Sequence, residues 1–533
     1  MNSDEIIDAL ELTAKLMELH KENPFKTKAL SNAAFKLSKL RYDFECKSKE
    51  EIENIEGIGK GISAKIIELL TTGTTHELSE LCANTPVGVI DMLGIKGLGP
   101  KKVRQLWLEL GLESVGELLY ACNENRLTAL KGFGEKTQTQ VKLSIEFKLS
   151  NERKFHYAAL ENKVQALLNA IQTQQPSCLA IPAGQFARHC EIIDDLQILV
   201  SEPLQIAVDP LTAVIPLPVK WIMSNPSDFY TDAIKYSATD KHLQHIAFQS
   251  LSPKSYASQE EVYAALQLPY IVPELREGLG EVELAKTNRL PKLIQFSDLQ
   301  GCLHNHSTYS DGVHTLREMA DHCRELGYSY FGICDHSKSA GYANGLSIER
   351  VMEQHHEIDT LNASYNGFRI LKGIESDILN DGSLDYPDEV LKSFDFVVAS
   401  VHSNLKMTEE KATQRLLKAI ENPYTSILGH PTGRLLLARP GYPIDHKKVI
   451  DACAANGVAI ELNAHPYRLD IDWRWIPYCL EKGVKISVNP DAHHKDGFHD
   501  MYYGICVARK GWLTKETCLN ALSLSALLEE FKK

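Results

Sequence analysis

The sequence predicts a multidomain protein that begins with helical domains and ends in a parallel β/α barrel. The length of 533 residues corresponds to about three or four domains. A glycine-containing pattern followed by a helical segment occurs three times in the first 150 residues. After residue 300, short apolar runs alternate with amphipathic segments, and 14 of the 20 histidines lie there. We therefore expect the two halves to differ in fold and in chemistry.

Composition and charge restrict the classes of function. The 57 Lys and Arg residues against 70 Asp and Glu residues give a net charge of −13, so a uniformly basic surface is excluded and any DNA contact must be local. No run of 18 apolar residues and no signal peptide occurs, so we expect no membrane contact. The 12 cysteines form no CxxC pair, as expected for a cytoplasmic protein. The sequence does not determine the oligomeric state, and a monomer is our working expectation.

Three segments near the N-terminus share the order apolar–x–Gly–apolar–Gly before a helical pattern: IEGIGKGISAKIIELL (55–70), IKGLGPKKVRQLWLEL (95–110) and LKGFGEKTQTQVKLSI (130–145). Glycines permit a tight turn and a close approach to phosphate, and the following helix N-terminus favours an anion. One such glycine pair could merely form a turn, but three copies with nearby lysines favour helix–hairpin–helix motifs. Such motifs bind the DNA backbone independently of its sequence. The candidate DNA-binding residues are Gly57, Gly59, Lys60, Gly97, Gly99, Lys101, Lys102, Gly132, Gly134 and Lys136.

Residues 1–145, including ENPFKTKAL (22–30), resemble the lyase and fingers domains of family X DNA polymerases. The resemblance implies a lyase-like domain at 1–80 and a fingers-like domain with two helix–hairpin–helix motifs at 81–150. In that family a lysine on the first hairpin helix forms a Schiff base that removes 5′-deoxyribose phosphate, and Lys65 falls at the matching place. Lys65 is therefore a possible lyase residue, although a lysine on an exposed helix face can equally be a solvated charge.

Residues 151–290 resemble the palm, thumb and connector of the same family, which implies an α+β nucleotidyltransferase-like domain. The segment AGQFARHCEIIDDLQILV (183–200) resembles the Gly-Ser motif and the strand with the Asp-x-Asp pair. Nucleotidyl transfer needs carboxylates that hold two metal ions. Asp195 fits the first carboxylate position. The positions that depart from the family are Gln185 for the serine, Gln197 for the second carboxylate and Lys220 for the third.

A neutral amide and a cation cannot replace two anionic metal ligands, because the cation repels the ions. We therefore expect a degenerate palm remnant without polymerase activity. The alternative is that Asp194 or Glu191 substitutes in a shifted register.

The C-terminal part contains seven candidate strands, most of which end in His, Asp or Glu. Parallel barrels collect their chemistry at the C-terminal ends of the strands. In LHNHSTYSDG (303–312), His304 and His306 project from the same face of an extended strand. Clustered carboxylates would be costly there without a cation. The candidate metal-ligating and catalytic residues are His304, His306, Asp311, His336, Glu375, His402, His430, Asp491 and His493.

Residues 291–533 resemble the PHP (polymerase and histidinol phosphatase) domain, which implies a distorted (β/α)7 barrel with up to three metal ions. The resemblance groups His304, His306, Glu375 and Asp491 on one ion, Glu375, His402 and His430 on a second, and Asp311, His336 and His493 on a third. A set of imidazoles and carboxylates without thiolate suits Mn²⁺, Zn²⁺ or Fe²⁺. Two arginines that also match the family are candidates for binding substrate phosphate, or alternatively are salt-bridge partners: Arg434 and Arg468.

Together these features predict a DNA-repair nuclease that hydrolyses DNA phosphodiesters by metal-bound hydroxide in the PHP domain. The resemblance alone implies 3′–5′ exonuclease activity, with 3′-end or abasic-site processing. A small-molecule phosphatase of the histidinol-phosphate type would leave the first 300 residues without a role. A DNA-binding scaffold predicts eroded ligands, whereas all are present. A still active gap-filling polymerase is disfavoured by Gln197 and Lys220.

Overall fold

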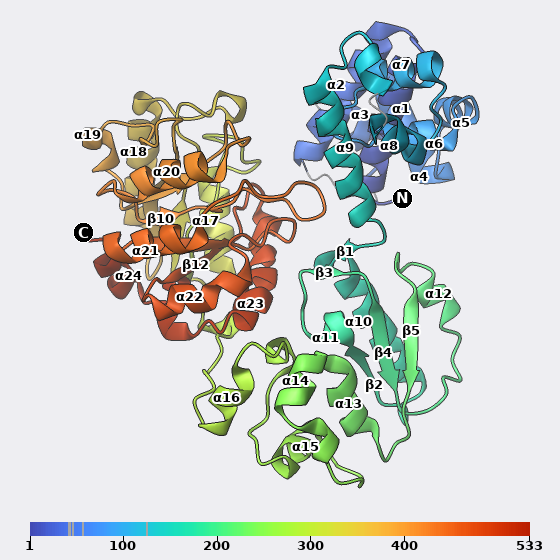
Figure 1. Cartoon of the computed structure of the whole chain (residues 1–533). Helices are drawn as coiled ribbons and strands as arrows, with labels where there is room; N and C mark the ends of the chain where they lie inside the picture. The colour runs from blue at the N-terminus through green and yellow to red at the C-terminus, as the bar shows by residue number, and fades with distance from the viewer. Residues whose placement is uncertain (41–43, 45–46, 56–57, 124–125, 533) are drawn as a thin grey trace. The chain divides into compact units, whose positions relative to one another are not determined.

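A computed structural model of the chain describes residues 1–532 except 41–43, 45–46, 56–57 and 124–125 (Figure 1). The chain divides into two compact units, Met1–Glu152 and Arg153–Lys533. Among the described residues, no helix is both long enough and apolar enough to cross a membrane.

The first unit is helical. Its first helix starts at a capping box, in which the Asn2 side chain accepts from the backbone N–H of Glu5 and the Glu5 carboxylate accepts from that of Asn2. One hydrophobic cluster extends from Ile6 to Ile145 and gives this unit its core. The helices are α1 (Ser3–Leu19), α2 (Pro24–Leu40), α3 (Lys49–Glu53), α4 (Lys60–Thr72), α5 (His76–Ala83), α6 (Val87–Met92), α7 (Pro100–Leu110), α8 (Val115–Asn123) and α9 (Glu135–Ser150).

The second unit begins with an α+β segment built on a small mixed sheet. Strand β4 (Leu196–Val200) is central, antiparallel to β2 (Ala180–Ala183) and parallel to β5 (Val219–Met223). A separate pair, β1 (Phe155–His156) with β3 (Ile192–Ile193), is antiparallel. The helices of this segment are α10 (Tyr157–Gln174), α11 (Gly184–Ala187), α12 (Asp209–Thr212), α13 (Phe229–Ser237), α14 (Asp240–His245), α15 (Gln259–Ala265) and α16 (Glu281–Lys286).

The remainder of the second unit is a seven-stranded parallel barrel (Figure 1). Neighbouring strands pair in the order β12-β11-β10-β9-β8-β7-β6, and a parallel bridge between Asn305 and Ala492 nearly closes the ring. The strands are β6 (Gly301–Cys302), β7 (Tyr330–Ile333), β8 (Arg369–Asp377), β9 (Phe396–Ser400), β10 (Ile427–Leu428), β11 (Ala459–Asn463) and β12 (Ile486–Asn489). The predicted fold class is thereby confirmed.

Helices follow the strands and bury the apolar surface of the barrel. Helix α17, for example, starts at a capping box between Thr315 and Glu318 and buries Leu316, Met319 and Cys323. The helices are α17 (Leu316–Glu325), α18 (Ile348–Ser364), α19 (Asp388–Leu391), α20 (Glu409–Ile420), α21 (His446–Asn456), α22 (Ile476–Glu481), α23 (Met501–Lys510) and α24 (Leu524–Glu530).

Helix α23 joins the barrel to the preceding α+β segment through buried ion pairs. The fully buried Lys510 ammonium donates to Glu277 (2.6 Å) and to the Arg188 carbonyl (2.9 Å). The neighbouring Arg509 donates to Glu274 (2.9 Å). These contacts fix the barrel and the α+β segment as one unit.

Candidate metal centre and DNA contacts

The candidate ligands lie together at the C-terminal ends of the barrel strands. Glu375 belongs to β8, and the others follow the ends of β6, β7, β9, β10 and β12. Gly312 allows the loop after β6 to fold back, because a Cβ there would lie 2.7 Å from the carbonyl carbon of His306. Because each ligand follows or ends a strand, the strand ends bring the imidazoles and carboxylates together in a ring.

Glu375 lies at the middle of this ring. Its Oε1 is 3.0 Å from Nε2 of His430, 3.1 Å from Nε2 of His402 and 3.4 Å from Nε2 of His304. Its Oε2 is 2.9 Å from Nδ1 of His336. His306 Nε2 lies 3.7 Å from Oε2, so this one carboxylate contacts five imidazoles, an arrangement in which it can bridge metal ions.

A second set of contacts lies on the β12 side. His306 Nε2 is 3.0 Å from Asp491 Oδ1, and His493 Nε2 is 3.2 Å from Asp311 Oδ1. Ligand atoms within 4.8 Å of one another define three groups that could hold metal ions, and His306 and His336 belong to two groups each. The groups are His306, Asp311, His336 and His493; His304, His306 and Asp491; and His336, Glu375 and His402.

Several buried polar atoms of this ring lack a hydrogen-bond partner. Unpaired polar atoms in a protein interior are costly, and bound cations would satisfy them. With no thiolate among the donors, the set fits divalent ions bound by imidazole and carboxylate. Within the described part of the chain, the atoms without a partner in hydrogen-bond geometry are His304 Nε2, His306 Nδ1, His336 Nδ1, Glu375 Oε2 and His430 Nδ1, although Glu375 Oε2 and His336 Nδ1 lie close together.

The electrostatics of the ring also favour cations. Burial opposes ionisation of Glu375, but the adjacent His402 and His304 hold its pKa well below the usual value. Burial lowers the pKa of His306 to about 3, helped by the neighbouring His493 and His336. The ring therefore contains ionised carboxylates and a neutral imidazole that are competent to bind metal. Although burial opposes it, Glu375 and Asp377 raise the pKa of His402 to about 10, so a metal ion bound there would displace a proton.

Two carboxylates that the sequence analysis did not identify orient the ligands from behind. Glu461 accepts from His304 Nδ1 (2.7 Å) and from the backbone N–H of His430 (2.8 Å), and Asp377 accepts from His402 Nδ1 (2.5 Å). Such contacts fix the tautomer and the ring orientation of a ligand. Glu461 is a lone acid inside the apolar run VAIELN, and this was the available signal in the sequence.

The two candidate phosphate-binding arginines differ in their surroundings. Three nitrogens of Arg434 donate within the protein: Nη1 to Asp472 (2.7 Å), Nε to the Arg468 carbonyl (3.0 Å) and Nη2 to the Leu469 carbonyl. Arg468 lies beside the ring, with Nε 4.0 Å from Asp491 Oδ2. Arg468 is therefore the better placed of the two to contact a phosphate at the ring.

In the α+β segment, the candidate palm residues lie close together. Gln197 and Lys220 are direct partners across β4 and β5. Lys220 Nζ lies 2.5 Å from Asp195 Oδ1, and Gln197 Nε2 donates to Asp195 Oδ2 (2.5 Å). Gln185 accepts from the backbone N–H of Asp194 (2.9 Å). Each oxygen of Asp195 thus has a side-chain partner, Lys220 at Oδ1 and Gln197 at Oδ2.

Glu191 is turned away from this group. Its Oε2 accepts from the Trp473 indole N–H (3.1 Å) and its Oε1 from Arg474 (2.8 Å), both in the barrel. It is therefore unavailable as a substitute palm carboxylate.

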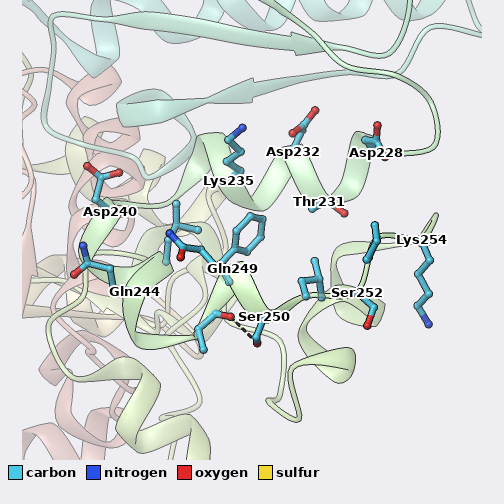
Figure 2. Close-up of a pocket in the computed structure, with 15 residues that line it drawn as sticks. Asp228, Thr231, Asp232, Lys235, Asp240, Gln244, Gln249, Ser250, Ser252 and Lys254 are labelled. Carbon is cyan, nitrogen blue, oxygen red and sulfur yellow. Dashed lines mark hydrogen bonds between the residues drawn. The ribbon is translucent and has the colours of Figure 1, made fainter.

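A cavity of about 1130 Å³ lies beside α13 and α14 in the same segment. Figure 2 shows Asp228, Asp232 and Lys235 along α13, with Asp240 and Lys254 from the neighbouring elements. Three carboxylates against two ammonium groups offer no concentration of positive charge for a triphosphate.

The glycines of the predicted hairpins occupy turn and cap positions. Gly59, Gly99 and Gly134 are the N-caps of α4, α7 and α9, without a side-chain cap. A Cβ on any of them would meet no atom of the described residues within 4 Å, so these helix N-termini have room for a ligand. Gly97 and Gly132 have φ angles of 92° and 90°, which favour glycine. Gly57 lies outside the described residues.

The lysines of the hairpins are mostly exposed. Lys60, Lys101 and Lys136 lie on the surface, and Lys102 lies 5.4 Å over the Phe133 ring. Lys65, the candidate lyase residue, forms an ion pair with Glu77.

Comparison with known proteins matches each part of the chain. A helix–hairpin–helix domain model matches residues 1–75, a SAM-like helix–hairpin–helix tandem matches 89–146 and a PHP domain matches 303–465. Fold and site thus define a multidomain protein in which helix–hairpin–helix motifs precede a PHP barrel that can hold metal ions.

A protein of Bacillus subtilis (strain 168) named DNA polymerase/3′-5′ exonuclease PolX is 34% identical over 570 aligned residues, which cover 98% of each chain. The chain belongs to the PolX family. Proteins named probable phosphatases match about a third of the chain. One from Acetivibrio thermocellus is 32% identical over 36% of this chain and 78% of its own length. One from Thermoanaerobacter sp. (strain X514) is 29% identical over 37% of this chain and 87% of its own length.

Proposed function

We propose that this chain is a DNA-repair nuclease that hydrolyses DNA phosphodiesters as a metal-dependent 3′–5′ exonuclease and processes 3′ ends or abasic sites. The observation that carries the proposal is the Glu375-centred ring, which is complete in a chain that also presents three open helix N-termini in hairpin motifs. The name of the Bacillus subtilis relative, which includes a 3′-5′ exonuclease, supports the direction of digestion.

The residues that would hold the ions are the nine candidates of the ring, with Mn²⁺ or Zn²⁺ as the preferred ions and Fe²⁺ as a third possibility. Bound divalent ions would supply an activated water for hydrolysis and would neutralise charge on the phosphoryl oxygens. Glu461 and Asp377 keep the ring imidazoles oriented, so the site is organised before substrate binds. The ring residues are, in chain order, His304, His306, Asp311, His336, Glu375, His402, His430, Asp491 and His493.

The exposed side of the ring indicates where the substrate enters. The His493 side chain is 37% exposed and that of Asp311 17%, whereas His304 and His306 are fully buried. A phosphodiester approaching past His493 reaches the ring beside Arg468, whose guanidinium can hold a phosphate oxygen and orient the scissile bond. The buried imidazoles lie behind this position.

The hairpin motifs would hold the DNA backbone. The open N-termini of α4, α7 and α9 present backbone amides, and Lys60, Lys101 and Lys136 add positive charge. Such contacts do not depend on base sequence. Lyase chemistry at Lys65 requires that its amine be released from Glu77. Trapping with borohydride on DNA that carries a 5′-deoxyribose phosphate tests for it.

The palm is proposed to be inactive in nucleotidyl transfer. Support comes from Asp195, whose two oxygens have Lys220 and Gln197 as partners. Partial burial alone would raise the pKa of Asp195, but the contact with Lys220 lowers this pKa. The aspartate and the lysine therefore form an ion pair whose charges cancel. Two divalent ions would have to displace an ammonium group from the one carboxylate left.

Incubation of the full chain with Mn²⁺ and end-labelled primer–template DNA, with and without nucleotides, tests both statements. We expect shortening from the 3′ end without extension, and loss of hydrolysis in His336→Ala. Extension of the primer would overturn the inactive palm, and full activity of His336→Ala would overturn the ligand assignment.

A small-molecule phosphatase is the second candidate, because relatives named probable phosphatases match 36% and 37% of this chain. Intact DNA together with rapid hydrolysis of histidinol phosphate in the same assay would favour it.

A further inference from the structure

The part of the rim that carries Arg468 lies outside the barrel strands. Two loops form it: the β10 loop (residues 430–440) and the β11 loop (residues 464–475). Within them Thr432 Oγ1 donates to Asp470 (2.9 Å), and the Leu436 N–H donates to the Tyr467 carbonyl (2.7 Å). Arg434 of the β10 loop also donates hydrogen bonds to the Arg468 carbonyl and to Asp472 in the β11 loop. The position of Arg468 therefore depends on how these two loops are held together.

The outer side of both loops is held by the palm remnant. His156 Nε2 donates to the Leu436 carbonyl of the β10 loop (3.0 Å). Its ring packs on Tyr467 of the β11 loop, with ring centroids 4.4 Å apart. Glu191 is buried, and its carboxylate accepts hydrogen bonds from Trp473 and Arg474 of the β11 loop. Both palm residues belong to one local structure, because the β1–β3 pair places His156 opposite Ile192.

A continuous set of polar contacts runs inward from Glu191. Arg474 Nη1 also contacts Asp472 Oδ1 (3.0 Å), and Asp472 Oδ2 receives Arg434 Nη1 (2.7 Å). Arg434 in turn donates to the carbonyl of Arg468 (3.0 Å), and the Arg468 guanidinium lies 4.0 Å from the candidate ligand Asp491. Glu191 thus stands at the outer end of a chain of contacts whose inner end is the metal ring.

We propose that Glu191 of the palm remnant is a positioning residue for the PHP centre, which it serves through Arg474, Asp472 and Arg434 by fixing Arg468 for the substrate phosphate. The inference rests on the proposed function and extends it: a palm without its own metal site remains part of the nuclease as the outer wall of the rim. It also gives the palm residue Glu191 a role that needs no nucleotide chemistry.

The first test is independent of catalysis. Hydrogen exchange in the metal-free full chain compares wild type with Glu191→Ala and, as a matched control, Asp209→Ala, an exposed carboxylate of the same segment. We expect amides of the β10 and β11 loops to exchange about tenfold faster in Glu191→Ala alone, with strands β8 and β9 unchanged. Unchanged exchange in the two loops overturns the proposal.

The second test is a double-mutant cycle on hydrolysis of DNA by the Mn²⁺-loaded enzyme. Glu191→Ala should lower kcat/KM about fivefold to tenfold, mainly through KM, and Arg434→Ala should remove most of that effect because both act on one chain of contacts. Additive effects overturn the proposal. If the wild-type protein leaves DNA intact, the proposed function is refuted instead. The double-mutant cycle is then measured with bis-p-nitrophenyl phosphate as the substrate. No hydrolysis of either substrate overturns both.

Discussion

The largely buried pair of Glu277 and Lys510 yields a prediction for the stability of the second unit. The Lys510 ammonium is fully buried, lies 2.6 Å from Glu277 Oε1 and packs 4.6 Å over the Trp473 ring. At that separation the attraction is about 6 kcal/mol for an effective dielectric constant of about 20. Desolvation of both groups offsets part of it, and removal of one partner of a buried pair costs about 3–5 kcal/mol. We expect Glu277→Gln, which keeps an acceptor oxygen, to cost about 3 kcal/mol.

The cost should depend on pH. Burial alone would raise the pKa of Glu277, but the charges of Lys510 and Arg188 lower this pKa below its ordinary 4.5. Because the folded pKa is the lower one, the carboxylate stabilises the fold above about pH 4.5 and this contribution is lost as the pH falls through the folded pKa. The difference between wild type and Glu277→Gln should therefore be largest at neutral pH and should shrink in acid.

Urea unfolding followed by tryptophan emission measures this, since four of the five tryptophans lie in the second unit. Glu283→Gln is the control, because its ion pair with Lys286 is exposed and should be worth less than about 0.5 kcal/mol. A cost below about 1 kcal/mol for Glu277→Gln, or a cost independent of pH, would refute the reasoning.

Three further predictions concern the metal centre and DNA. Glu461→Gln should weaken Mn²⁺ binding about 10- to 100-fold by calorimetry, since Glu461 orients His304; unchanged affinity would contradict this. Gly97→Ala should weaken DNA binding about fivefold by fluorescence anisotropy, because alanine is strained at a φ of 92°, while Gly116→Ala should bind like wild type. Removal of metal by EDTA should lower the melting temperature of the second unit, and Mn²⁺ should restore it; an unchanged melting temperature would count against ions bound to the folded state.

The sequence was sufficient for the barrel and for the side chains at its rim. Apolar runs that alternate with amphipathic helices predict parallel strands, and parallel strands bring their C-terminal ends to one rim. His336 and Glu375, 39 positions apart in the chain, could therefore be placed on one rim before any contact was known, although the resemblance assigned them to different ions. In the structure, His336 Nδ1 lies 2.9 Å from Glu375 Oε2. Glycine hairpins were equally accessible, because their spacing and their helices are local features.

The tertiary structure alone decided which groups support the rim. Glu461 and Asp377 stand within strand sequences, and only packing shows that they orient His304 and His402. Glu191, read from the sequence as a possible palm carboxylate, meets Trp473 across 282 positions. The physical reason is that backbone periodicity fixes the face on which a side chain lies, whereas its hydrogen-bond partner depends on which distant element packs against that face.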